Sequence, residues 1–234
     1  MFVLTGAGIS AESGIPVFQG TSWRGYPHYQ LATIDAWRAD PKLVWEYYSY
    51  RRDSARQARP NPAHRALGEF EKSARGRFFL CTQNVDRLHE AAGSREVVHI
   101  HGKLFESRCS ADCGRAASSD ERSYAGKGLP GCDCGALLRP NVCWFGERPY
   151  DLERVFRELE LCDHFLAIGT SGSVEPVASF VGMLKGHNRK TRTISIGLEE
   201  PANAGHFDEI HLGLASLVVP KILAELQNQT RQLT

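Results

Sequence analysis

Four cysteines near the middle of the chain have the residue type and the spacing of a metal site. Cys109 and Cys113 are separated by three residues, and Cys132 and Cys134 by one. Four thiolates are enough to hold a zinc ion tetrahedrally, and such a closed site leaves no open position for catalysis. Both spacings differ from the usual two-residue knuckles, so the alternative is a group of four unliganded thiols. We expect one structural zinc that stabilises the fold.

A glycine-rich turn near the N-terminus has the pattern of a phosphate-binding loop. The apolar run FVL at residues 2–4 predicts a buried strand, and GAGISA at residues 6–11 matches Gly-x-Gly-x-x-Gly/Ala. In this pattern the glycines allow a tight bend and a close approach of the backbone to a pyrophosphate, which faces the N–H groups of the next helix. Gly14 and Pro16 end that helix after about two turns. We therefore expect a variant nucleotide site, closed by the aromatic- and glycine-rich loop at residues 18–29.

Polar clusters follow three predicted strands, at the point where each strand ends. They are GAG at residues 6–8, QNVD at residues 83–86 and GTS at residues 169–171. Because ligands bind beyond the carboxyl ends of parallel strands, we expect these clusters to converge on one crevice. Asn84 and Asp86 are also residue types that cap helices after a strand, so both interpretations are open at this point.

Two histidines, His99 and His101, are candidates for acid–base chemistry. They lie two positions apart, so in an extended strand they share a face. A neutral imidazole can accept a hydroxyl proton at physiological pH. Spacing alone does not choose between them, and either can be an ordinary packed histidine.

Helices and strands alternate along the parts of the chain that must position these groups. The predicted helices cover residues 41–56, 63–74, 152–161, 174–185 and 216–226. The predicted strands cover residues 2–5, 77–82, 97–101 and 191–198, and residues 165–171 form a strand that ends in a loop. This alternation predicts an α/β fold with a doubly wound, Rossmann-like parallel sheet. Residues 109–134, rich in cysteine and without periodicity, interrupt it as an inserted metal module.

The composition limits the class of protein. The chain has 234 residues, of which 42% are apolar and 24% charged, as in an ordinary soluble globule. A net charge of +1 gives no electrostatic basis for binding nucleic acid or a membrane surface, and no apolar stretch approaches the ~20 residues of a membrane span. Seven cysteines, an odd number, favour metal ligands and free thiols over disulfides. We expect a monomer in the cytoplasm.

The opening segment GAGISAESGIPVFQ resembles the signature of the sirtuins, the NAD-dependent protein-lysine deacylases. The tetrapeptide QNVD and the pair His101-Gly102 are similar to two further sirtuin motifs, and the resemblance covers essentially the whole chain. It implies that NAD is the co-substrate and that acyl groups are removed from protein lysines, giving nicotinamide and O-acyl-ADP-ribose. It also implies that Asn84 orients the nicotinamide ribose, that Asp86 binds the nicotinamide carboxamide and that His101 is the general base.

The resemblance further implies a set of cofactor-binding residues. At two of them the chain departs from the family: Gln19 replaces an arginine, and Gly197 replaces an asparagine that binds the adenosine ribose. The lost cation at Gln19 motivates the alternatives of an NAD-binding regulator, or an NAD hydrolase or ADP-ribosyl transferase, with weak deacylase activity. The full set is Gly6, Ala7, Gly8, Ala11, Phe18, Gln19, Gln83, Asn84, Asp86, His101, Gly169, Thr170, Ser171, Gly197, Leu198 and Ala215.

Residues 138–147, LRPNVCWFGE, resemble the sirtuin segment to which a substrate peptide adds as an extra strand through main-chain hydrogen bonds. The carbonyl of Cys143, at the family's valine position, would accept the acyl-lysine N–H. Phe145 and Gly146 would line the same segment. Partners are therefore expected to be proteins or peptides that carry an acyl-lysine.

The stretch LVWEYYSYRR at residues 43–52 resembles class III sirtuins, which act on succinyl- and malonyl-lysine. Tyr48 and Arg51 lie three residues apart on one helix face, and the resemblance implies that they bind the free carboxylate of these acyl groups. A guanidinium offers a planar, charged fork that suits a carboxylate. Ala32 matches the small residue that makes room for the longer acyl chain. The alternative is an aromatic packing stripe beside a solvated arginine.

The expected domain organisation follows from these assignments. Residues 1–28, 57–103 and 138–234 would form the NAD-binding domain. Residues 29–56 and 104–137 would form a small discontinuous domain, part helical and part zinc module. The substrate would lie between the two, where ligand sites are common.

Overall fold

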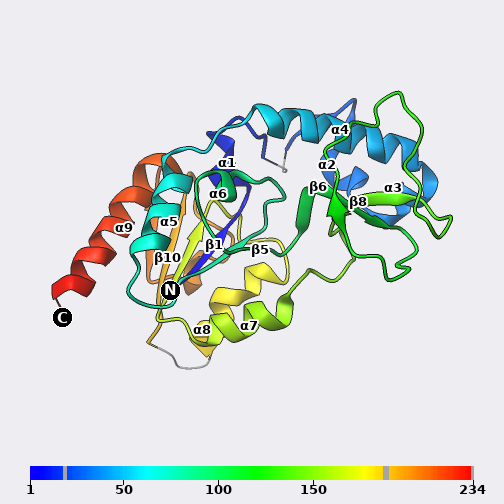
Figure 1. The fold of residues 1–234 in the computed structure, drawn as a ribbon. Helices are drawn as coiled ribbons and strands as arrows, with labels where there is room; N and C mark the ends of the chain where they lie inside the picture. Colours follow the sequence, from blue (N-terminus) through cyan, green and yellow to red (C-terminus); the bar gives the residue numbers. More distant parts are fainter. Residues whose placement is uncertain (18–19, 187–189, 233–234) are drawn as a thin grey trace.

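A six-stranded parallel sheet forms the centre of the molecule in the computed structural model, which describes residues 1–17, 20–186 and 190–232 (Figure 1). The strand order is β11-β10-β9-β1-β4-β5, and every neighbouring pair is parallel. In chain order the strands are β1 (Phe2–Thr5), β4 (Phe79–Thr82), β5 (Val97–His99), β9 (His164–Ile168), β10 (Arg192–Gly197) and β11 (Glu209–Leu212). The chain builds outward from β1 to β5 and then returns to the other side of β1. The order reverses between β1 and β9, which is where doubly wound sheets bind ligands.

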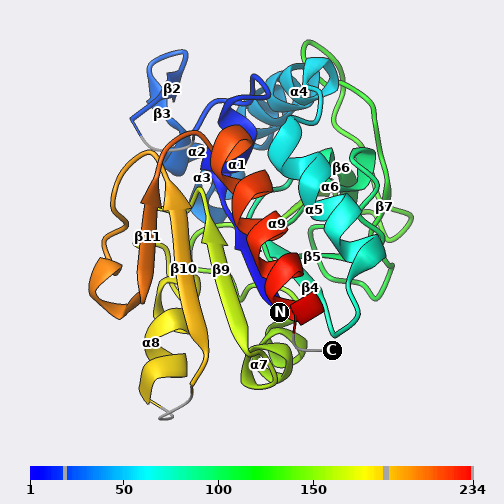
Figure 2. The same cartoon turned by 90° about the vertical axis from the view of Figure 1, so that its left-hand side faces the viewer.

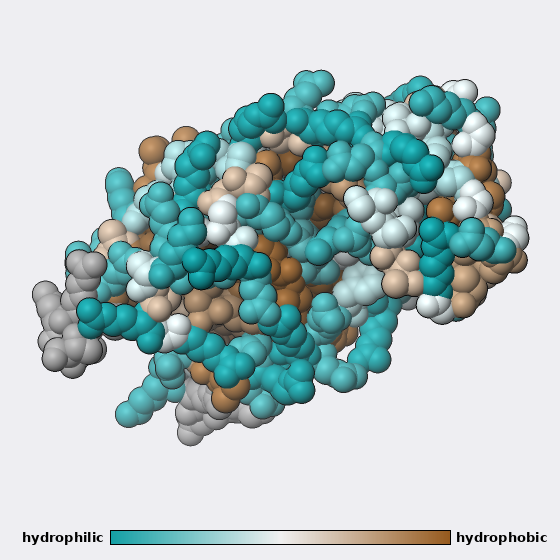
Figure 3. Space-filling model, in the orientation of Figure 1, coloured by the Kyte–Doolittle hydropathy of each residue, from teal (hydrophilic) through white to brown (hydrophobic). Residues whose placement is uncertain are grey.

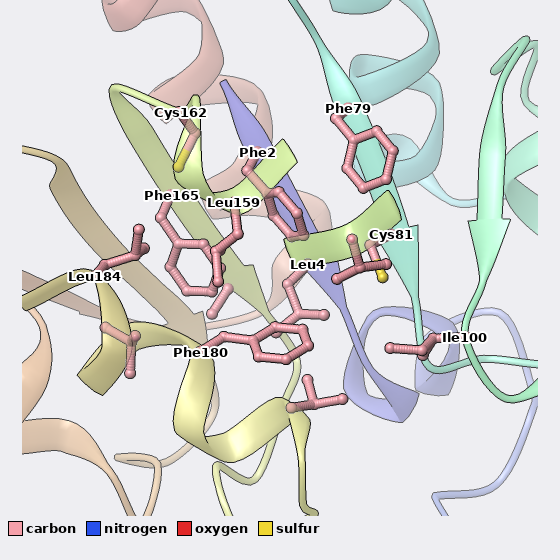
Figure 4. Packing of buried hydrophobic residues seen from close by; sticks show 14 of the residues in the cluster. Phe2, Leu4, Phe79, Cys81, Ile100, Leu159, Cys162, Phe165, Phe180 and Leu184 are labelled. Atoms are coloured by element: carbon pink, nitrogen blue, oxygen red, sulfur yellow. The ribbon is translucent and has the colours of Figure 1, made fainter. Parts of the chain in front are cut away.

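Helices cover both faces of this sheet, which confirms the predicted doubly wound α/β fold (Figure 2). One face packs against α5 (Pro62–Ser73) and α9 (Ala215–Gln232), and the other against α7 (Leu152–Glu160) and α8 (Phe180–Gly186). Because β1 is buried on both faces, its residues alternate between two cores and read as a continuous apolar run. Phe2 and Leu4 enter the α7–α8 core, shown in Figure 4, while Val3 enters the α5–α9 core.

A second group of elements lies beyond the ends of β4 and β5 (Figure 1). It has its own apolar cluster, in which Trp45, Tyr47, Tyr48 and Trp144 are at most 1% exposed. Its helices are α2 (His28–Leu31), α3 (Ile34–Ala39) and α4 (Pro41–Gln57). Its strands are the hairpin β2 (Ser22–Trp23) and β3 (Tyr26–Pro27), and the antiparallel sheet of β6 (Gly102–Cys109), β7 (Ser118–Ser119) and β8 (Leu138–Val142).

The buried guanidinium of Arg52 joins α4 to this antiparallel sheet. It donates hydrogen bonds to the carbonyls of Leu104 (2.9 Å), Glu106 (3.2 Å) and Arg122 (2.7 Å), and it pairs with Asp120 at 3.5 Å. Both side chains of the ion pair are fully buried, so α4 is held to β6 and to the inserted segment by one multivalent contact.

Several expected boundaries differ from the observed ones. The helix predicted at residues 174–185 is a 3-10 turn (Val177–Ser179) followed by α8, because a proline disfavours helical backbone at the residue before it and Pro176 therefore starts the turn. The strand predicted at residues 97–101 ends at His99, and the expected loop at residues 18–29 contains β2, β3 and the start of α2. Among the described helices, none is both long and apolar enough to cross a membrane.

Candidate active site

Three glycines bring the carboxyl ends of β1 and β9 into backbone contact. The N–H of Gly6 donates to the carbonyl of Ile168 at 3.0 Å, and that of Gly8 to the carbonyl of Gly169 at 2.9 Å. A Cβ at Gly6 or Gly8 would lie 2.7 Å from the Gly169 backbone, and Gly169 itself has a φ of +63°. The expectation that these glycines serve the approach of a ligand is therefore incomplete, since strand-to-strand contact already requires them.

Asn84 links the end of β4 to the glycine turn. Its amide nitrogen donates to the carbonyl of Gly6 and to the hydroxyl of Ser10, both at 3.0 Å, and Ser10 in turn donates to Asp86 at 3.0 Å. Asp86 also accepts the N–H of Leu88, the first residue of α6 (Leu88–Ala91), although the N-cap position of that helix is Arg87. Burial raises the pKa of this carboxyl although its hydrogen bonds oppose the shift. Asn84 and Asp86 are thus placed by one chain of hydrogen bonds.

The two histidines differ in the atoms that surround their ring nitrogens. His99 has Nδ1 at 2.9 Å from the carbonyl of Asn84 and Nε2 at 2.7 Å from the carboxylate of Glu90. Both ring nitrogens of His99 therefore face acceptors of the protein, and neither is open to a substrate hydroxyl. His101 lies in the turn after β5, and its Nδ1 is 3.2 Å from the carbonyl of Gln83. This contact assigns the proton to Nδ1 and leaves the Nε2 lone pair available.

His101 is neutral at physiological pH. Burial lowers its pKa below the ordinary 6.5, and the hydrogen bond to Gln83 offsets this only in part. The two histidines were expected to share a strand face, but β5 ends at His99. They therefore present their rings to different neighbours.

The segment after β8 runs between His101 and Ala32. The N–H of Cys143 donates to the backbone carbonyl of His101 at 2.9 Å, and the N–H of Phe145 donates to the carbonyl of Ala32 at 3.0 Å. The carbonyl of Cys143 accepts no hydrogen bond from the described residues. Phe145 is 50% exposed, and Gly146 turns the chain with a φ of +87°. The backbone of this segment is thus fixed on one side and accessible at Cys143.

Arg51 and two tyrosines of α4 form a polar group inside the aromatic cluster. The Arg51 guanidinium lies 5.6 Å from the ring centre of Tyr48 and 5.8 Å from that of Tyr47. The Tyr48 hydroxyl accepts the indole N–H of Trp144 at 2.9 Å, and the Tyr47 hydroxyl lies 2.9 Å from Nδ1 of His28. Burial alone would lower the pKa of Arg51, but the two hydroxyls raise it, so its charge is secure. The alternative interpretation is correct for the aromatic stripe, since Tyr47 and Tyr48 are fully buried, while Arg51 is partly buried beside their rings.

The remaining residues of the expected cofactor set lie along the same edge of the sheet. Thr170 and Ser171 follow β9, Gly197 ends β10, and Ala215 begins α9. Leu198 is 68% exposed beside them. Figure 3 shows apolar side chains gathered in the recess between the sheet and the second group of elements. Phe18 and Gln19 lie outside the described residues.

The four cysteines come together as predicted. Their sulfur atoms all lie within 4.8 Å of one another, and the distances are 3.5 Å for Cys109–Cys134 and 3.7 Å for Cys113–Cys132. Tetrahedral zinc–thiolate bonds of about 2.3 Å place the sulfurs about 3.8 Å apart, so these residues fit a structural zinc. Backbone N–H groups of Cys113 and Ala111 lower the pKa of Cys109 to about 6, which favours the thiolate that zinc binds.

Sequence reasoning missed three residues that the structure places at the site. Ser10 lies within the glycine motif, yet only its contacts with Asn84 and Asp86 reveal its position. Trp144 and His28 read as core aromatics, and their polar contacts with Tyr48 and Tyr47 span 96 and 19 positions.

Comparisons with known proteins agree with this architecture. The Sir2 family model matches residues 6–176. The chain is 40% identical to the NAD-dependent protein deacylase of Pasteurella multocida over 234 residues, covering 95% of this chain and 96% of that protein. Identity to the Yersinia pestis protein of the same name is also 40%, over 95% of this chain and 81% of that one.

Solved structures give the same result. A Sir2 homologue in complex with NAD has a TM-score of 0.89 and 39% identity, covering 97% of this chain and 90% of that one. A Sir2 protein bound to an acetylated peptide has a TM-score of 0.82 and 26% identity, covering 97% of this chain and 92% of that one.

Proposed function

The chain belongs to the Sir2 family and is an NAD-dependent protein deacylase, and we propose that it prefers lysines carrying succinyl or malonyl groups. The observation that carries the proposal is the position of Arg51 beside the hydroxyls of Tyr47 and Tyr48. A charged fork beside aromatic side chains suits an acyl group that ends in a carboxylate and gives no advantage to an acetyl group.

The proposed NAD site runs along the carboxyl ends of β1, β4, β9 and β10. Gly6, Gly8 and Gly169 leave the strand ends free of side chains, which supports a close approach of the cofactor phosphates. The amide oxygen of Asn84 accepts no hydrogen bond from the described residues, so it can receive a ribose hydroxyl. Asp86, held by Ser10, would bind the nicotinamide carboxamide.

We assign the remaining residues of the predicted cofactor-binding set to NAD as well. Bound NAD supplies an electrophilic ribose carbon whose bond to nicotinamide breaks. The other residues that we assign to its binding are Ala7, Ala11, Phe18, Gln19, Gln83, Thr170, Ser171, Gly197, Leu198 and Ala215.

We assign the general base to His101. Its Nδ1 proton is directed at the Gln83 carbonyl, which leaves Nε2 to accept a proton from a ribose hydroxyl. Its lowered pKa keeps the ring neutral at the pH of the reaction. The geometry of His99 argues against the alternative, because both of its nitrogens face acceptors.

The acyl-lysine peptide would add as a strand to residues 143–146. The backbone carbonyl of Cys143 would accept the acyl-lysine N–H, with Phe145 and Gly146 beside it. The backbone N–H of Cys143 is hydrogen-bonded to the His101 carbonyl, and that of Phe145 to the Ala32 carbonyl. The same segment therefore borders both the proposed base and the small residue proposed to make room for the acyl chain. This continuity supports a peptide path from the cofactor crevice to Arg51.

The zinc and the domain organisation belong to the same proposal. Cys109, Cys113, Cys132 and Cys134 would hold a zinc ion that stabilises the insert and takes no part in the chemistry. We propose the division into an NAD-binding domain (1–28, 57–103, 138–234) and a small domain (29–56, 104–137), with β2 and β8 of the first set packing in the apolar cluster of the second. None of the seven cysteines, all within the described residues, is in a disulfide, which supports a reducing compartment such as the cytoplasm. A monomer remains our expectation for the assembly.

Nicotinamide release from saturating NAD tests the proposal. Matched peptides carrying succinyl-, malonyl-, acetyl- or unmodified lysine are compared, with deacylated peptide measured in parallel. We expect release that depends on the acyl peptide and a higher kcat/KM for the succinyl and malonyl forms. Release without peptide would identify an NAD hydrolase or transferase, NAD binding without release would identify a regulator, and equal kcat/KM for acetyl would refute the acyl preference.

A further inference from the structure

Trp144 holds the hydroxyl of Tyr48 from a different part of the chain. It lies in the proposed peptide segment after β8, whereas Tyr48 lies on α4, and its indole Nε1–H donates to the Tyr48 oxygen at 2.9 Å. The Trp144 side chain is 1% exposed, with the Arg139 guanidinium 3.3 Å from one ring centre and the Trp37 ring 5.8 Å away. Its orientation is therefore fixed by packing on several sides.

The direction of this hydrogen bond follows from chemistry. An indole nitrogen only donates, so the Tyr48 oxygen must accept. Arg51 also hydrogen-bonds to this hydroxyl, and a guanidinium likewise only donates. A phenol oxygen has two acceptor positions and one proton. With both acceptor positions filled by donors, the Tyr48 proton is left for an acceptor, and no described residue accepts it.

We propose that Trp144 is a positioning residue for acyl specificity, which fixes the Tyr48 hydroxyl as a donor to the carboxylate of the acyl group. This rests on the proposed function of Tyr48 and Arg51. An O–H and a guanidinium, both donating, are complementary to a carboxylate, and hydrogen bonds in series strengthen one another. The residue that borders the peptide backbone thus also sets the polarity of the acyl pocket.

Tyr47, one position earlier on α4, also contacts Arg51, but its second partner is not restricted to donating. Its hydroxyl is bonded to Nδ1 of His28, an atom that can donate or accept according to the tautomer. The direction of that hydrogen bond is therefore adjustable. Tyr48 is the tyrosine whose oxygen is held by two groups that can only donate.

Kinetics of Trp144→Phe test the inference, with Trp37→Phe as the matched control. Trp37 packs against Trp144 and is equally aromatic, but it makes no contact with Tyr48 that would orient the hydroxyl. For Trp144→Phe we expect the succinyl-to-acetyl ratio of kcat/KM to fall about three- to tenfold, the usual effect of one hydrogen bond, mainly through a higher KM for the succinyl peptide. The ratio in Trp37→Phe should stay within about twofold of wild type. Equal losses on both peptides would mean that Trp144 acts by packing, and would overturn the inference.

A double-mutant cycle separates positioning from a direct contact. In a Tyr48→Phe background, adding Trp144→Phe should leave the succinyl-to-acetyl ratio unchanged, because the hydroxyl through which Trp144 acts is gone. A further fall of the same size would show that Trp144 acts independently of Tyr48, and would refute the proposal.

Indole N–H resonances give a readout that needs no Trp144 variant. The chain has four tryptophans, so a ¹⁵N-labelled sample shows four such signals, which triple-resonance spectra assign. The Trp144 signal should move in Tyr48→Phe, and in wild type it should move with succinyl-lysine peptide more than with acetyl-lysine peptide. An unmoved signal in Tyr48→Phe would overturn the inference whatever the substrate. A signal that moves in Tyr48→Phe, in an enzyme without acid-acyl preference, would instead refute the proposed function.

Discussion

Replacing Arg51 by methionine should convert the enzyme from an acid-acyl to a neutral-acyl preference. Methionine keeps a long unbranched stem in the aromatic cluster but removes the charge and the donors. The carboxylate of a succinyl group would then meet the Tyr47 and Tyr48 side chains with no cation to receive it. An acetyl group, which never reaches the guanidinium, would lose nothing.

The size of the effect follows from the surroundings of Arg51. Hydrogen bonds to charged groups contribute about 1.5–3 kcal/mol, and each 1.4 kcal/mol is a factor of ten. Arg51 is packed among aromatic rings, where screening by water is reduced, and the Tyr47 and Tyr48 hydroxyls raise its pKa and hold its charge. We therefore expect kcat/KM for the succinyl peptide to fall roughly 10- to 100-fold. The value for the acetyl peptide should stay within about twofold.

The assay is deacylation at saturating NAD, with succinyl and acetyl forms of one peptide measured on each variant. Arg56→Met is a matched control, because Arg56 lies on the same helix but pairs with Asp53. Arg51→Lys should fall between wild type and Arg51→Met, since lysine keeps the charge and loses the fork. If Arg51→Met lowers kcat/KM equally for both peptides, or if Arg56→Met changes the succinyl-to-acetyl ratio as much as Arg51→Met does, Arg51 stabilises the fold and does not bind the carboxylate.

Three further predictions concern the base, the zinc and a buried histidine. His101→Ala should lower deacylation about 10²- to 10⁴-fold, while calorimetry shows NAD binding little changed; full turnover in the variant would exclude this base. Because burial lowers the pKa of His101, wild-type kcat should rise with pH and reach its plateau by about pH 7. Cys134→Ser should abolish stoichiometric zinc in elemental analysis and lower Tm, whereas Cys162→Ser, outside the cluster, should keep the metal. A zinc content in Cys134→Ser equal to that of wild type would contradict the four-thiolate site. Burial lowers the pKa of His64 to about 4, so the unfolded chain binds the extra proton between about pH 4 and 6.5 and stability falls as pH drops through that window. Between pH 7.5 and pH 5.5, His64 alone should lower the free energy of unfolding, measured with urea, by roughly 1 kcal/mol. In His64→Gln the fall over this range should be smaller by that amount, and an unchanged fall would refute a neutral buried His64.

The sequence predicted the central sheet because its strands carry local signals. Phe2, Val3 and Leu4 form an apolar run between two cores, and the turns after β1, β4 and β9 are built from residues that suit strand ends. The antiparallel strands β6 and β7 were not predicted, because their order depends on long-range pairing beside the cysteine cluster and not on an alternating pattern. The edge strand β11 was also not predicted, because it is short and half-exposed and lacks the apolar run of the central strands.

The site was predictable in its residue types and less so in its geometry. The motifs named Asn84 and His101, but spacing could not rank His101 above His99, since the difference lies in the acceptors that face each ring. The glycines were assigned to a ligand, whereas their nearest neighbour is the Gly169 backbone. Trp144 escaped notice because a buried tryptophan looks the same in a sequence whether or not its N–H has a partner.

The contact of Arg52 with three carbonyls limits how substrate range can diverge in proteins built on this plan. Because β6 and the segment beside the cysteines grip the helix that carries Tyr48 and Arg51, the helix cannot tilt or slide without losing several buried charged hydrogen bonds at once. A new acyl preference is therefore more accessible by exchanging individual side chains on a stationary helix than by reshaping the pocket wall. Natural variants with altered substrate choice should keep an arginine at position 52 while positions 47, 48 and 51 vary.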